Sequence, residues 1–154
     1  MASTLKVTLT ENLTLGGTDY SSQKVLTLST ITNVYKTTVN VSTSGGEILA
    51  LAAAAGNIGT LDQDLIEYMR ITNLDTTNFV ELGFEDTSGN NAYFVKLDAG
   101  RSFIVPTPNL TTEHPTFFAN DGGHATGSHV DINSITADAD TAACNLEILV
   151  AMNG

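Results

Sequence analysis

The sequence is poor in several residue types, and each scarcity excludes a kind of protein. Cys144 is the only cysteine in 154 residues, which excludes an internal disulfide and a zinc site built from several cysteines. Tryptophan is absent and aromatic residues make up only 6% of the chain. This scarcity disfavours a carbohydrate site made by ring stacking, for which Tyr35, Tyr68 and the pair Phe117-Phe118 are the candidates.

Basic residues are also scarce. Six lysines and arginines stand against 17 aspartates and glutamates, giving a formal net charge of −11. The six are scattered, whereas nucleic-acid binding needs clustered cations that displace counterions from phosphates. We therefore expect no nucleic-acid partner, and solubility at neutral pH explains the acidity.

Long hydrophobic runs are missing as well. The longest, Ile48–Ala55, is too short to span a bilayer, and the residues around Leu5, Val7 and Leu9 lack the basic and apolar regions of a signal peptide. These features predict a soluble protein made in the cytoplasm, with no membrane partner.

Alternating apolar residues between turn-rich segments dominate what is present. The stretch Leu65–Pro106 reads as four strands separated by turns, which predicts an antiparallel β-meander. Within it, Val80, Leu82 and Phe84 share one face of a strand. Thr, Asn, Ser and Gly supply most polar positions, a composition that suits strands joined by tight turns.

The flanking segments follow the same pattern. Leu5 to Leu15 predicts one long strand, or two interrupted near Glu11-Asn12, followed by a loop at Gly16–Asp19. Ile48–Ala55 predicts a buried strand that runs into a loop of small residues, with a short helix as the alternative. Gly59–Asp64 favours a helical turn or an acidic loop. A last strand places one set of residues on one face: Cys144, Leu146, Ile148, Val150 and Met152.

Together these strands predict an all-β fold, an antiparallel β-sandwich or jelly-roll-like barrel. We expect a single domain over residues 1–154, with 109–128 as a long irregular loop. Its core should contain the faces Val80/Leu82/Phe84 and Leu146/Ile148/Val150.

Motifs for chemistry are weak. His124 and His129 flank a glycine-rich segment where two imidazoles could bind a metal, but glycines do not preorganise such a site. Asp131, Asp138 and Asp140 lack the further ligands of a calcium loop, so turn residues are the better interpretation.

Nucleophile and phosphate motifs are absent from the sequence: it has no Gly-x-Ser-x-Gly elbow and no phosphate-binding loop. Cys144 lies on the apolar face of a strand and reads as a small core residue. We expect no catalytic residues, no cofactor, no metal and no enzymatic activity.

Apolar surface points to partners instead. The leucines from Leu5 to Leu15 and the run Ile48–Ala55 exceed what one small core needs, which predicts a homo-oligomer. Phe117 and Phe118 are the predicted interface residues, because paired exposed rings need a covering partner. Packing of both rings in the domain's own core is the alternative.

Several phrases resemble small virion proteins of tailed bacteriophages, particularly marine ones: MASTLKVTLTENLTLGG at 1–17, LTLSTITNVYK at 26–36, YMRITNLD at 68–75, NFVELGF at 78–84 and the hairpin Leu97–Phe103. The resemblance implies a virion protein made in the host cytoplasm, most simply a capsid decoration (cement) protein. Its implied partners are the major capsid protein, other virion proteins and itself, as a trimer. A tail, fibre or knob component, or a host-surface carbohydrate-binding module, are the alternatives.

Overall fold

The computed structural model describes residues 3–52, 59–86, 92–105, 118–121 and 128–154. These residues form strands and one short 3₁₀ helix, η1 (Gln63–Leu65). The strands are β1 (Ser3–Glu11), β2 (Thr14–Leu15), β3 (Thr18–Asp19), β4 (Ser22–Ile31), β5 (Asn33–Val41), β6 (Gly46–Ala52), β7 (Thr60–Asp62), β8 (Ile66–Asn73), β9 (Val80–Glu85), β10 (Ala92–Leu97), β11 (Ser102–Val105), β12 (Phe118–Asp121), β13 (Ser128–Asp131), β14 (Ser134–Ala139) and β15 (Cys144–Met152). In these parts of the chain no helix is long and apolar enough to cross a membrane.

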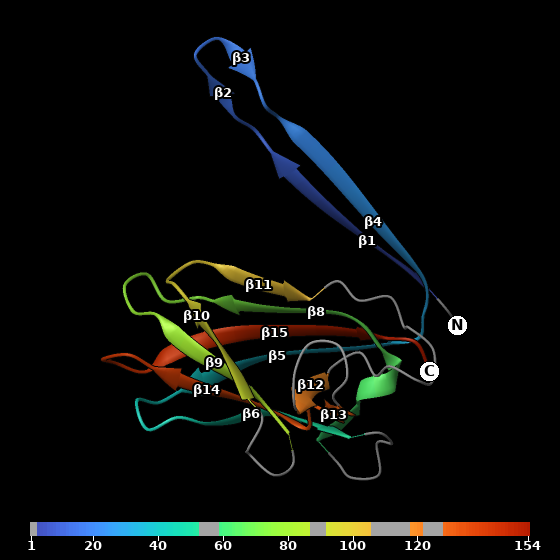
Figure 1. Cartoon of the computed structure of the whole chain (residues 1–154), viewed down its shortest axis with the longest axis vertical. Helices are drawn as coiled ribbons and strands as arrows, with labels where there is room; N and C mark the ends of the chain where they lie inside the picture. Colours follow the sequence, from blue (N-terminus) through green and yellow to red (C-terminus); the bar gives the residue numbers. More distant parts are fainter. Residues whose placement is uncertain (1–2, 53–58, 87–91, 106–117, 122–127) are drawn as a thin grey trace.

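Two sheets form the body of the molecule. One has four strands in the order β11-β8-β15-β5, and the other has five in the order β10-β9-β14-β6-β7 (Figure 1). All neighbours are antiparallel except β6 and β7, which pair in parallel. The predicted all-β sandwich is therefore confirmed.

The core lies between the two sheets. The predicted faces Val80/Leu82/Phe84 and Leu146/Ile148/Val150 are confirmed, since all six side chains are fully buried in one cluster. Across the sandwich the rings of Phe84 and Phe103 lie 5.5 Å apart at a tilt of 55°. Cys144 is buried in the same cluster, as predicted.

The predicted meander over Leu65–Pro106 is wrong in its connections, although its four strands exist. β9 and β10 pair as a hairpin, but β8 and β11 belong to the opposite sheet and pair with each other. The chain crosses between sheets after β8 and again after β10. An alternating pattern reports which residues face a core, and both sheets of a sandwich face the same core, so it does not distinguish a hairpin from a crossing.

The structure also decides between the alternatives for two segments. Gly46–Ala52 is a strand, not a helix, and residues 53–55 of the predicted run lie outside the described residues. Residues 60–65 form β7 and η1, so the predicted helical turn is present only in its second half.

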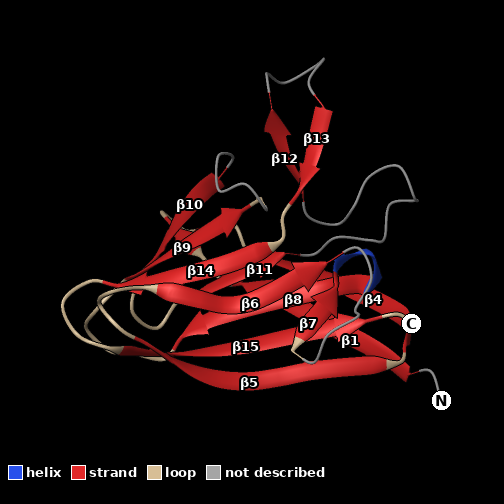
Figure 2. Cartoon of the chain, turned by 90° about the horizontal axis from the view of Figure 1, so that it is seen from below, coloured by secondary structure: helices blue, strands red, loops and turns tan. Residues whose placement is uncertain are grey.

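Part of the predicted irregular loop 109–128 is regular, because Phe118–Asp121 pairs with Ser128–Asp131. The backbone of β12 forms a regular strand because it pairs with β13, and the pattern of apolar and polar residues does not predict this pairing. Figure 2 shows this hairpin projecting from the sandwich beside β14. The rest of 109–128 lies outside the described residues.

A long hairpin, residues 3–31, projects from the body in a different direction, and we call it the arm (Figure 1). β1 pairs with β4 along its length, and β2 pairs with β3 at its far end. Gly16 and Gly17, with φ of 60° and 84°, form the two-residue turn between them. The predicted loop Gly16–Asp19 is therefore wrong in extent, since Thr18 and Asp19 already belong to β3.

At the root of the arm, β4 carries one extra residue relative to β1. The register shifts between Ser3 and Leu5, and Thr30 there has a φ of 70°. A bulge of this kind bends its strand and increases its twist, so it helps set the direction in which the arm leaves the body.

Candidate interaction surface

The far half of the arm, residues 9–24, exposes large apolar side chains, and we call it the distal arm. Leu9 is 55% exposed, Leu13 is 53% and Leu15 is 67%, and Tyr20 is similarly open. A two-stranded ribbon buries little by itself and is marginal in water without a covering surface. The distal arm is therefore the part of the described chain that most needs a partner.

The root of the arm already has a surface to pack on. Leu28 and Ile31 are buried against Tyr68 of β8 and Ala151 of β15, with partly buried leucines and Val7 around them. Tyr68 and Ala151 point away from the core, because their neighbours along each strand point into it. The arm thus begins on the outer face of the four-stranded sheet and diverges from that face toward its tip (Figure 1).

That outer face is ordered in rows across the strands. The row under the arm root is apolar: Val34, Ala151 and Tyr68. The next row places Lys36, Leu149, Arg70 and Ile104 side by side. The row after it carries Thr38, Glu147, Thr72 and Ser102. Val34 is 54% exposed and Ile104 is 39% exposed, so apolar surface remains open on both edge strands.

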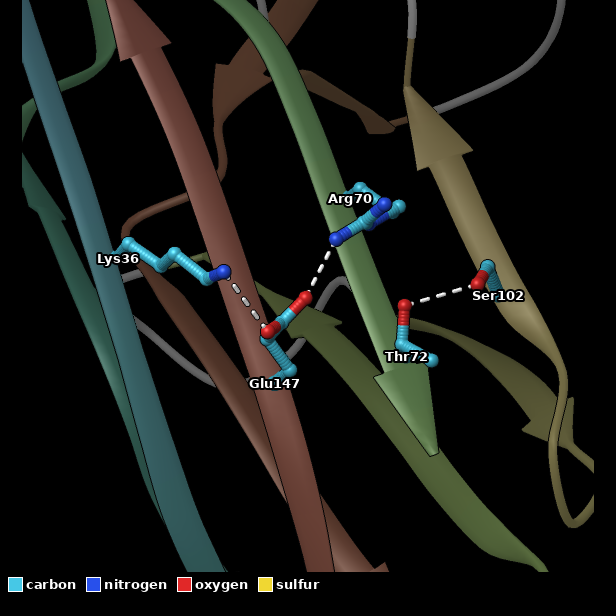
Figure 3. A network of polar contacts seen from close by, with 5 residues as sticks. All are labelled: Lys36, Arg70, Thr72, Ser102 and Glu147. Carbon is cyan, nitrogen blue, oxygen red and sulfur yellow. Dashed lines mark hydrogen bonds and ion pairs between the residues drawn. The ribbon is translucent and has the colours of Figure 1, made fainter. Parts of the chain in front are cut away.

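An ionic network connects the second and third rows. Lys36 Nζ lies 3.1 Å from Glu147 Oε2, and Arg70 donates to the other carboxylate oxygen (Figure 3). The hydrogen bond from Lys36, with the charges of Lys36 and Arg70, lowers the pKa of Glu147. Thr72 and Ser102 share a hydrogen bond of 2.8 Å beside it. With two cations and one carboxylate, this face is positive on an acidic protein.

The predicted interface pair is placed only in part. Phe117 lies outside the described residues, and Phe118 begins β12, where it pairs with Asp131. Their role as interface residues stays a prediction.

The weak metal candidates do not come together in the described parts of the chain. His124 lies outside them, and His129 belongs to β13, opposite Asn120. Asp138 and Asp140 are exposed, and no three His, Cys, Asp or Glu side chains of the described residues are grouped as metal ligands would be.

The aromatic and thiol candidates are packed. Tyr68 lies under the arm root and Tyr35 packs on the core, so neither offers an open face for sugar stacking. Burial raises the pKa of the Cys144 thiol, with smaller contributions from Asp75 and Asp140, which disfavours the reactive thiolate.

Two hollows of about 220 and 200 Å³ flank Gly45 and Gly46 on the five-stranded sheet. Both are open to solvent and smaller than ordinary ligand pockets, which run from about 300 Å³ upward.

Sequence reasoning missed the arm as a projecting hairpin, although a signal existed. Gly16-Gly17 between two apolar alternating segments is a strong two-residue hairpin signal. The ionic network was also missed. Its signal is Arg70, the only basic residue of the strand Ile66–Asn73.

Comparisons with known proteins add no family to this description. Neither the protein-family models, nor the curated proteins, nor the solved structures contain a match.

Proposed function

We propose that this chain is a non-enzymatic structural protein of a bacteriophage virion, and within that class a decoration protein that binds and stabilises the outside of the capsid. The observation that carries the proposal is the arm. A ribbon that leaves the body and exposes Leu13, Leu15 and Tyr20 at its far end suits contact with another protein and serves no chemistry on its own.

The net charge of the protein supports a position on the outer side of the capsid shell. A net charge of −11 is repelled by packaged DNA, whereas it is tolerated on a surface that faces solvent. The phrases that resemble phage virion proteins agree with this role.

Co-sedimentation tests the proposal. Purified protein is mixed separately with empty heads, with tails and with host-surface glycans, and the pelleted or retained fraction is measured. We expect saturable binding to heads and thermal stabilisation of the heads that carry it. Binding to tails alone would instead indicate a tail, fibre or knob component, and retention by glycans alone a carbohydrate-binding module.

A further inference from the structure

The distal arm and the outer face of the four-stranded sheet are both open surfaces, and both expose apolar side chains. At its root the arm packs Leu28 onto Tyr68 and Ala151 of that face. Beyond the root the same side of β1 continues with Leu9, opposite Lys24, because directly paired residues of a ribbon point to one side. The chain therefore contains an apolar stripe that fits this face and a length of that stripe left uncovered.

We propose that the uncovered stripe is filled by a second copy of this chain. The distal arm of each copy lies on the outer face of the other, beside the place where that copy's own arm root packs, so that the two arms are exchanged in a twofold pair. This deepens the proposed assembly role by naming one of its partners.

Charge favours a second copy as the occupant. Chains of net charge −11 repel one another over most of their surface, but the outer face presents Lys36 and Arg70 against one carboxylate, Glu147. On the side of the distal arm that carries Leu9, Glu11 and Lys24 balance each other, and Asp19 lies on the other side, opposite Thr14. The docking side of the arm is therefore neutral and meets the positive part of an acidic protein, so this pairing avoids the repulsion that other surfaces of two copies would meet.

The surface area that would be buried favours the reciprocal exchange of two arms over a contact made by one arm. Each strand of the distal arm, 9–15 or 18–24, extends about 24 Å, so one face of this part of the ribbon covers roughly 240 Å². Two exchanged arms and the surfaces beneath them would bury on the order of 1,000 Å², about the area at which specific interfaces begin, whereas a single arm would bury about half as much. A ring joined by one arm per contact falls below that size, so the geometry points to a pair and not to the trimer that the resemblance implies.

Three variants of the full chain test the exchange by sedimentation equilibrium. The arm variant is Leu9→Ser with Leu15→Ser, and the face variant is Val34→Ser with Ile104→Ser. All four side chains are exposed, so the melting temperature of the monomer should change little. The control is Phe94→Ser, which removes a ring that is 60% exposed on the opposite sheet.

We expect the unchanged chain and the control to form a dimer, and the arm and face variants each to weaken dimerisation at least tenfold. Mixing the arm variant with the face variant should recover part of the association. The mixed pair retains one intact arm on one intact face, whereas a pair of either variant alone retains none.

A monomer at all micromolar concentrations, a trimer, or an oligomer that the arm variant leaves intact would each overturn the proposal, as would a mixture that associates no better than its components. The measurement uses purified protein alone. Its failure therefore leaves binding to heads undecided, and a failure to bind heads leaves the exchanged pair standing.

Discussion

At the scale of single residues, Asn73 holds the two crossings between the sheets. Its Nδ2 donates to the carbonyl oxygens of Asn78 at 2.9 Å and Leu97 at 3.2 Å, and its Oδ1 accepts from the amide of Asp75 at 3.0 Å. The side chain is fully buried, so each of these groups depends on it in place of water. One amide therefore fixes both the segment after β8 and the segment after β10.

Asn73→Ala should lower the free energy of unfolding by about 2–4 kcal/mol, because buried backbone groups lose their partners. Asn40→Ala is the matched control, since Asn40 is exposed and donates to the side chain of another exposed residue, at 3.0 Å from Asn145 Oδ1. Urea denaturation followed by circular dichroism measures both. Equal, small losses for the two variants would show that Asn73 does not hold the crossings.

For Gln63 we expect the opposite effect, a gain of stability on substitution. It is fully buried, and neither atom of its amide has a hydrogen-bond partner among the described residues. An unsatisfied buried amide costs free energy that an apolar group of similar size avoids. Gln63→Leu should raise the free energy of unfolding by about 1 kcal/mol, measured by the same denaturation, and a loss of stability would mean that the amide is satisfied.

At the scale of elements, β9 and β14 approach closely at Gly83. A Cβ built there would lie 2.4 Å from Thr136 Oγ1, and 3.0 Å from atoms of Glu85 and Phe94. Gly83 pairs with Thr136 of β14. Because Gly83 has no side chain, there is room for the hydroxyl of Thr136, which donates to Glu85 Oε1 at 2.9 Å.

Gly83→Ala should destabilise the fold by about 1–3 kcal/mol through overpacking at this contact. Gly46→Ala is the control, because nothing lies within 4 Å of the position that a Cβ would take there and its backbone is not left-handed. Thermal melting separates the two. A melting temperature for Gly83→Ala as high as that of Gly46→Ala would contradict the close approach.

At the scale of the whole molecule, three carboxyl groups link stability to acid pH. Hydrogen bonds from Ser21 lower the pKa of Asp19, and those from the amides of Asn78 and Thr77 lower the pKa of Asp75. The hydrogen bond and charge of Lys36, together with Arg70, lower that of Glu147. A lowered pKa in the folded state means that the unfolded chain binds protons more readily as the pH falls.

The stabilisation from these groups is therefore complete above about pH 4, the pKa of free carboxyls, and is lost as the pH falls through the lower folded values. The melting temperature should drop on going from pH 6 to pH 3. The melting temperature of the Asp75→Asn variant should drop less. Its asparagine keeps an oxygen acceptor near the amides of Thr77 and Asn78 but cannot titrate. An identical drop in both proteins would exclude Asp75 as a source of the acid sensitivity.

The sequence by itself determined which residues face the core. Val80, Leu82 and Phe84, like Leu146, Ile148 and Val150, are large apolar residues at every second position of a strand, so they share the face that is buried. Cys144 was predictable for the same reason. Of the two alternatives for the first apolar segment, the interruption near Glu11-Asn12 is confirmed, because β1 ends at Glu11 and β2 begins at Thr14.

Only the tertiary structure decided how the strands are partnered. Which sheet receives β8 or β11 depends on crossings held by Asn73, and an amide in a turn-rich segment gives no sign of bonds to residues as distant as Leu97. The ionic network on the outer face joins Lys36, Arg70 and Glu147 from three separate strands, so it exists only once those strands are neighbours.

The arm shows the same division. The alternation of apolar and polar residues predicted the apolar side of β1. Alternation is a local property of the sequence. Burial of that side depends instead on which other segments of the chain pack against it. The body covers the stripe at Leu28 and leaves it exposed at Leu9 and Leu15, because the ribbon diverges from the sheet beyond its root. Local sequence therefore set the strand and its two faces, and the packing of distant segments decided which part of each face was left open.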